Sequence, residues 1–94
     1  MSKLEELRQS IDQIDQELVR LFERRMAVTR EVGEYKQANG IPVLDTARER
    51  EVLAKKVNLI SNPDLQADVV QLYENIMAIS RRQQRNHKSE AKRS

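Results

Sequence analysis

Arg25 occupies a position in this sequence where an apolar residue is expected. The neighbouring apolar residues alternate in steps of three and four, and we call this series the apolar stripe: Leu4, Leu7, Ile11, Ile14, Leu18, Leu21, Val28, Val32 and Tyr35. Arg25 falls between Leu21 and Val28, in the seam of an amphipathic helix. Because a guanidinium stays charged at any accessible pH, burying it without an anionic partner costs several kcal/mol. We therefore expect an anion at Arg25, either a protein carboxylate or a ligand.

Polar residues recur at inward-facing positions further along the chain. Lys36 follows Arg25 by about three helical turns, so the two residues share a face with their Cα atoms roughly 16 Å apart. Glu49 lies one turn before Leu53, on the inward side of a second helix. Ser80 and Gln84 are spaced i and i+4 and share a face on a third. Together these side chains predict a polar cavity inside a helical bundle.

The chemistry of such a cavity follows from its side chains. It offers fixed cations, one or two carboxylates, an amide and a hydroxyl. The sequence contains no cysteine, its single histidine is His87 near the C-terminus, and it has neither a glycine-rich phosphate loop nor a cluster of metal ligands. Covalent catalysis, metal-dependent hydrolysis and nucleotide binding are thus poorly supported, and we expect no cofactor and no metal. The cavity suits a dianionic small molecule, with donors placed where negative charge grows in a transition state.

Each polar residue also has a purely structural interpretation. Arg25 can form a buried ion pair with Glu49 that fixes the register of the helices. Lys36 can interact with the C-terminal end of the helix dipole, and Asp45 can cap the following helix, as can Glu49 through a capping box. The two polar residues of the third helix can mark the point where the bundle meets water.

Three helices account for nearly all of the chain, so the predicted fold class is all-α. The first helix continues to about Tyr35 and is ended by the segment 39–42, in which Gly40 suits a left-handed conformation and Pro42 cannot continue a helix. The second begins at Asp45 or Thr46 and runs to about residue 60. The third begins at residues 62–63, where an asparagine cap precedes a proline in the first helical position.

The length of the first helix predicts an oligomer. A helix of about 35 residues spans roughly 50 Å. A compact chain of 94 residues has a radius of gyration of only about 12 to 13 Å, so it cannot cover such a rod by itself. The simplest solution is a homodimer in which two long helices pack along their seams.

Composition and charge define the domain. The length of 94 residues predicts one domain, residues 1–85. The sequence has no cysteine, no signal peptide and no apolar run near 20 residues. We therefore expect a cytoplasmic protein without a membrane partner. Residues 81–94 carry six Lys or Arg and one acid, which leaves residues 1–80 with a net charge of −3. The end of the chain, residues 86–94, is predicted to be a disordered basic tail. Because it has no aromatic residue for base stacking, we expect no nucleic-acid partner.

Five separated motifs resemble the all-helical chorismate mutases of the AroQ class. In order along the chain they are LRQSIDQID at 7–15, ERR at 23–25, EVGEYK at 31–36, PVLDTARER at 42–50 and SRRQQ at 80–84. The resemblance covers about residues 4–85 and keeps the family's spacing without an insertion. It implies an intertwined homodimeric helical bundle with two active sites, each converting chorismate to prephenate on the way to phenylalanine and tyrosine.

The resemblance also implies a role for each site residue. It makes Arg8, Arg25 and Lys36 the cations that face the two carboxylates of the substrate. It gives Lys36 and Gln84 contacts with the ether oxygen, and Asp45 and Glu49 positions around the ring hydroxyl. Ser80 matches a carboxylate contact, and Arg48 matches a further polar residue of the site. The residues implied in catalysis are Lys36, Gln84, Arg25 and Glu49, and those in substrate binding are Arg8, Arg25, Lys36, Asp45, Arg48, Glu49, Ser80 and Gln84.

Arg8 permits a geometric test of this assignment. Along one helix Arg8 and Arg25 lie roughly 25 Å apart, so both reach one small ligand only if Arg8 comes from the other subunit. Two alternatives stay open. One is a lyase of the same fold that eliminates pyruvate from isochorismate, against which the set of Asp45, Arg48 and Glu49 argues. The other is a non-enzymatic dimeric helical module, in which the buried polar residues only set register.

Overall fold

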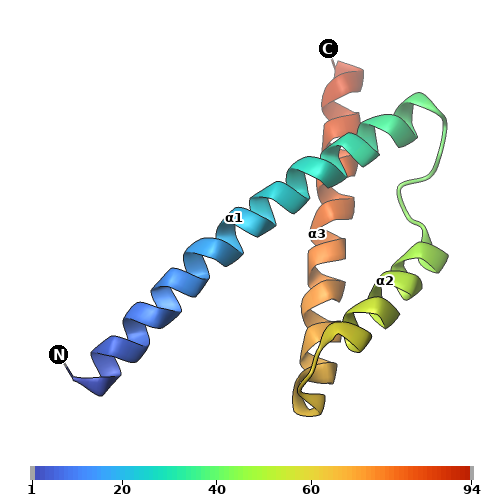
Figure 1. Cartoon of the computed structure of the whole chain (residues 1–94). Coiled ribbons are helices and arrows are strands. Elements are labelled where there is room, and N and C mark those ends of the chain that lie inside the picture. Colours follow the sequence, from blue (N-terminus) through green and yellow to red (C-terminus); the bar gives the residue numbers. More distant parts are fainter. Residues whose placement is uncertain (1, 94) are drawn as a thin grey trace.

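The described part of the chain forms three α-helices and one short 3₁₀ turn (Figure 1). The structure, a computed structural model, describes residues 2–93, and the side chains of residues 2–86. In chain order the elements are α1 (Lys3–Ala38), α2 (Thr46–Leu59), η1 (Pro63–Leu65) and α3 (Gln66–Arg93). The residues described thus form an all-helical structure, which confirms the expected fold class.

Side-chain caps define the ends of α1 and α2. Ser2 accepts a hydrogen bond from the backbone N–H of Glu5 at the start of α1. After Ala38 the chain turns through Gly40, whose φ of 65° is the left-handed conformation expected there. Asp45 then caps α2 by accepting a hydrogen bond from the N–H of Arg48. These local signals fix where the loop between the two helices begins and ends.

The third helix begins differently from the expectation. Asn62 caps the segment by accepting from the N–H of Asp64, and Pro63 follows as expected, but these residues start the 3₁₀ turn η1. The α-helical part starts at Gln66 and continues to Arg93. The predicted boundary at residue 85 therefore lies within α3. The predicted tail, residues 86–94, falls mostly outside the described side chains and stays a prediction.

Helix α3 packs against both α1 and α2, and in Figure 1 it crosses the C-terminal half of α1. Among the described side chains, the buried apolar residues are Met26, Val52 and Met77, and the buried polar residues are Ser80 and Gln84. The polar residues of α3 are thus part of the small core. This burial places Ser80 and Gln84 inside the fold, where water does not reach them freely.

The N-terminal half of α1 projects away from the other helices (Figure 1). The radius of gyration is 17.0 Å, whereas a compact chain of this length has about 12 Å. Every member of the apolar stripe is at least 41% exposed in the single chain. Among the residues described, no helix combines the length and apolar character that crossing a membrane requires.

Candidate active site

A pocket of about 320 Å³ lies between the three helices and the loop that joins α1 to α2. Its lining includes seven of the eight predicted site residues: Arg25, Lys36, Asp45, Arg48, Glu49, Ser80 and Gln84. The eighth, Arg8, lies near the N-terminus of α1, in the part that projects away from the pocket (Figure 1). The fold thus gathers residues that are far apart in the sequence at one place.

Arg25 reaches the pocket from α1. Its Nη1 donates a hydrogen bond of 3.4 Å to Oγ of Ser80, and its guanidinium carbon lies 5.8 Å from the centre of the Tyr73 ring. Ser80 Oγ in turn donates to the carbonyl of Ile76 at 3.0 Å. The ion pair with Glu49 that the sequence allowed is not the arrangement seen, because Glu49 is bonded elsewhere. Arg25 is therefore a half-buried cation held by a hydroxyl and an aromatic ring.

Lys36 lies in the last turn of α1 and also lines the pocket. Its Nζ donates to the carbonyl of Val43 at 2.9 Å, which ties the ammonium to the loop after the helix. An ammonium has three donor hydrogens. One hydrogen bond to the loop therefore fixes the position of the charge and leaves donor capacity for a ligand.

Gln84 is buried in the wall of the pocket, and its side chain lies directly against Gly33 of α1. A Cβ added at Gly33 would meet Cγ of Gln84 at 2.7 Å, closer than real Cβ contacts allow. The Oε1 atom of Gln84 is buried and has no hydrogen-bond partner among the described residues. Buried polar atoms are normally paired, so Oε1 has the capacity to accept a hydrogen bond, whereas any hydrogen bond that Gln84 donates comes from its Nε2.

Asp45 and Arg48 lie at the start of α2, and both have partners of their own. The Asp45 carboxylate caps the helix through the N–H of Arg48 at 3.0 Å. Nη1 of Arg48 bonds to Glu51 at 3.0 Å on the exposed side of the helix, where Lys55 also contacts that carboxylate at 2.8 Å. The hydrogen bond and charge of Lys55, with the charge of Arg48, lower the pKa of Glu51. The capping role expected for Asp45 is therefore confirmed, and it is compatible with a place in the pocket lining.

Arg81 is a pocket residue that the sequence reasoning missed. Its Nη1 donates to both carboxylate oxygens of Glu49, each at 2.5 Å, and so links α3 to α2. The sequence groups Arg81 with the basic residues at the end of the chain. Its spacing offered one signal, because Arg81 is one turn after Met77 and therefore lies on the inward side of α3.

The charges of the pocket are unequal. Its lining contains four cations, Arg25, Lys36, Arg48 and Arg81, and two carboxylates, Asp45 and Glu49. The excess of positive charge favours an anionic ligand. Within the part of the chain that the structure describes, His, Asp and Glu residues form no group of three that could hold a metal ion.

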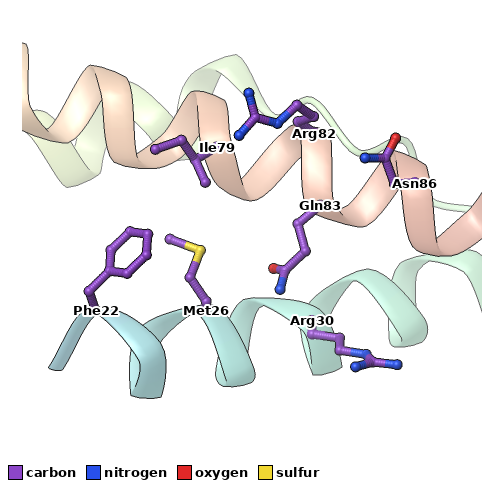
Figure 2. Close-up of a pocket in the computed structure, with 7 residues that line it drawn as sticks. All are labelled: Phe22, Met26, Arg30, Ile79, Arg82, Gln83 and Asn86. Atoms are coloured by element: carbon purple, nitrogen blue, oxygen red, sulfur yellow. The ribbon is translucent and has the colours of Figure 1, made fainter. Parts of the chain in front are cut away.

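A second pocket, of about 390 Å³, lies beside the contact between α1 and α3 (Figure 2). It is lined by Phe22, Met26, Arg30, Ile79, Arg82, Gln83 and Asn86. Figure 2 shows the side chains of Met26 and Gln83 extending from the two helices into the space between them. This pocket contains no carboxylate and none of the predicted site residues, so the first pocket is the better candidate for chemistry.

The chorismate mutase type II family matches residues 7–85 of this chain, the range in which the pocket residues lie. The chain belongs to this family. The match includes Arg8 and all residues of the first pocket, and it ends just after Gln84.

Relatives with established names show the same likeness. The bifunctional chorismate mutase/prephenate dehydratase of Aquifex aeolicus is 39% identical over 59 residues, which are 63% of this chain and 16% of the relative. The T-protein of Haemophilus influenzae is 31% identical over 71 residues, 76% of this chain and 19% of the relative. The chorismate mutase of Methanocaldococcus jannaschii is 38% identical over 50 residues, 53% of this chain and 50% of the relative. The chain thus matches half or less of the length of each.

Proposed function

We propose that this protein is an isomerase that converts chorismate to prephenate. The observation that carries the proposal is the lining of the first pocket, where residues from three helices form a cationic site at the positions that the family resemblance implies. Chorismate has two carboxylates, which match the excess of positive charge. We further propose that the reaction takes place in the cytoplasm and supplies the synthesis of phenylalanine and tyrosine.

The proposed roles follow the placement of the side chains. Arg25 binds a substrate carboxylate, with Ser80 holding its guanidinium in place. Lys36 binds a carboxylate and, together with the Gln84 amide, donates to the ether oxygen of the substrate. Glu49 accepts a hydrogen bond from the ring hydroxyl. Asp45 and Arg48 complete the polar wall of the site on the α2 side, and Arg8 supplies a further cation.

The reaction explains why such a site needs no nucleophile. The rearrangement of chorismate is unimolecular: the C–O bond of the ether breaks while a new C–C bond forms. The cations hold the flexible enolpyruvyl group over the ring, which removes the entropy cost of reaching the reactive conformer. Negative charge develops on the ether oxygen in the transition state, where the donors of Lys36 and Gln84 stabilise it in a partly enclosed site.

The active unit in this proposal is an intertwined homodimer with two sites. The apolar stripe supports it, because nine apolar residues exposed along one helix form an unusually large apolar face for a soluble monomer. Arg8 supports it too, because it lies roughly 25 Å from Arg25 along a continuous helix. In the dimer each pocket receives Arg8 from the partner subunit.

The test follows the ultraviolet absorbance of chorismate after mixing with purified protein, with the Arg25→Ala variant assayed in parallel. We expect the wild type alone to consume chorismate, and acid treatment to convert its product to phenylpyruvate. Consumption without phenylpyruvate, or activity on isochorismate with release of pyruvate, would contradict the mutase. Full activity in Arg25→Ala would remove Arg25 from the site.

A further inference from the structure

Arg81 and Glu49 form the contact that closes the pocket wall between α3 and α2. Nη1 of Arg81 lies 2.5 Å from both carboxylate oxygens. The two side chains are each only 25% exposed, and both line the pocket. Partial burial makes such a pair stronger than a surface salt bridge, because solvent screens it less.

Glu49 has other cations within the same pocket. Arg25 and Lys36 reach the pocket from α1, Arg48 precedes Glu49 on α2, and Asp45 adds a second carboxylate at the end of the loop. A carboxylate surrounded by several cations has several favourable positions. The contact with Arg81 selects one of them. It also leaves lone pairs on both carboxylate oxygens, since each oxygen can accept more than one hydrogen bond.

We propose that Arg81 is a positioning residue, which holds the Glu49 carboxylate where it accepts the hydrogen bond of the substrate's ring hydroxyl. This inference rests on the proposed function. Arg81 acts through Glu49 and does not itself contact the reacting atoms. Without Arg81, Glu49 turns toward Arg25 or Lys36 and competes there with the carboxylates of the substrate. Loss of Arg81 therefore affects both the binding of chorismate and its alignment for reaction.

The experiment compares the kinetics of Arg81→Gln, Arg81→Lys and Arg85→Gln with those of the wild type. Arg85 is a matched control, because it is an exposed arginine one turn further along α3 and lies outside the pocket lining. We expect Arg81→Gln to raise KM and lower kcat, with kcat/KM reduced on the order of 10-fold to 10²-fold, as misplacement of a site group does. Arg81→Lys restores part of the loss, and Arg85→Gln stays within about twofold of the wild type.

Two further measurements separate positioning from a merely structural role. In the Glu49→Gln background, Arg81→Gln should cause little additional loss. With 4-deoxychorismate, which lacks the ring hydroxyl, Arg81→Gln should lower kcat/KM less than it does with chorismate, because only the competition of Glu49 with the substrate carboxylates remains. An undiminished effect of Arg81→Gln in either experiment would overturn the proposal.

Failure of the proposed function gives a different result. In that case the wild type leaves chorismate unchanged, and the pairing is still measurable by urea unfolding of the two single variants and the double variant. Non-additive unfolding free energies would support the contact between Arg81 and Glu49. Additive values would overturn the contact itself, and with it the inference.

Discussion

Lys36 is the residue that contributes most to the proposed chemistry, because its charge lies in the pocket and is fixed by the Val43 carbonyl. The Lys36→Ala variant should lose on the order of 10²-fold or more in kcat, the usual effect of removing a donor to a developing negative charge. Steady-state kinetics with chorismate measure the loss. The side chain is not part of the small core, so circular dichroism should show unchanged helix content.

The exposed Lys55 provides a matched control for this variant. Lys55→Ala removes the same type of charge from the outer side of α2, where the side chain is 59% exposed. It should leave kcat within about twofold of the wild type. Near-normal turnover in Lys36→Ala, or equal losses in both variants, would refute the assigned role of Lys36.

Glu51 gives a prediction about pH. The hydrogen bond and charge of Lys55, followed by the charge of Arg48, lower the pKa of Glu51 from its ordinary value of 4.5 in the folded state. Because the pKa of Glu51 is lower in the folded state, its ionised carboxylate stabilises the fold. This stabilisation is fully present above the pKa of the unfolded state and is lost as the pH falls through the pKa of the folded state. An NMR titration of the Glu51 carboxyl carbon in the folded protein should give a pKa below 4.5. In Lys55→Ala the pKa of Glu51 should rise. An unchanged pKa would mean that Lys55 does not cause the shift.

At the scale of the elements, the crossing of α1 and α3 decides where the Gln84 amide lies. The Gly33→Ala variant places a Cβ 2.7 Å from Cγ of Gln84, so the amide or the helix must move. We expect kcat to fall on the order of 10-fold or more through displacement of Gln84. Alanine favours a helix interior by about 1 kcal/mol over glycine, which offsets part of the cost of the clash.

The Gly33→Ala prediction is measured by kinetics together with thermal unfolding. A loss of activity with a modest change in melting temperature is the expected combination. Normal turnover in Gly33→Ala would show that the crossing adjusts without moving Gln84, or that the amide has no role in the reaction.

The elements were predictable from the sequence to the extent that they depend on local signals. Gly40, Asp45 and Asn62 all act at the ends of helices as their residue types predict. The 3₁₀ turn at Pro63 was not predicted, because an asparagine cap followed by proline favours a 3₁₀ turn and an α-helical turn alike.

Much of the candidate site was predictable in the same way, because helical periodicity shows which polar residues face inward. The sequence did not predict which charged residue pairs with which. Periodicity places Arg25, Arg81 and Glu49 on inward faces, but the choice between two cations for one carboxylate depends on the distances between helices. The same holds for Gly33, whose contact with Gln84 exists only because two helices cross there.

At the scale of the whole molecule, the proposed sharing of sites between subunits can be tested by mixing two inactive variants. Arg8→Ala and Arg25→Ala each damage both sites of their own homodimer. A heterodimer of the two has one site with both substitutions and one site with neither. After unfolding and refolding together at equal concentrations, the mixture should regain about a quarter of the wild-type activity, the fraction of intact sites under random pairing.

The separately refolded variants serve as controls for this experiment, and the activity of the mixture is measured with chorismate. Activity no higher than the mean of the two separate variants would mean that Arg8 and Arg25 act within the same subunit, or that Arg8 is not part of the site.

The few buried apolar residues of the single chain have a consequence for the life of the protein in a cell. Among the described side chains only Met26, Val52 and Met77 are buried apolar residues, and they are too few to offset the entropy lost in ordering a chain of this length. On the proposed assembly, a newly made chain therefore stays open to proteases and chaperones until it meets a second chain. Its steady-state abundance should then rise more steeply than its rate of synthesis, because survival requires an encounter between two copies.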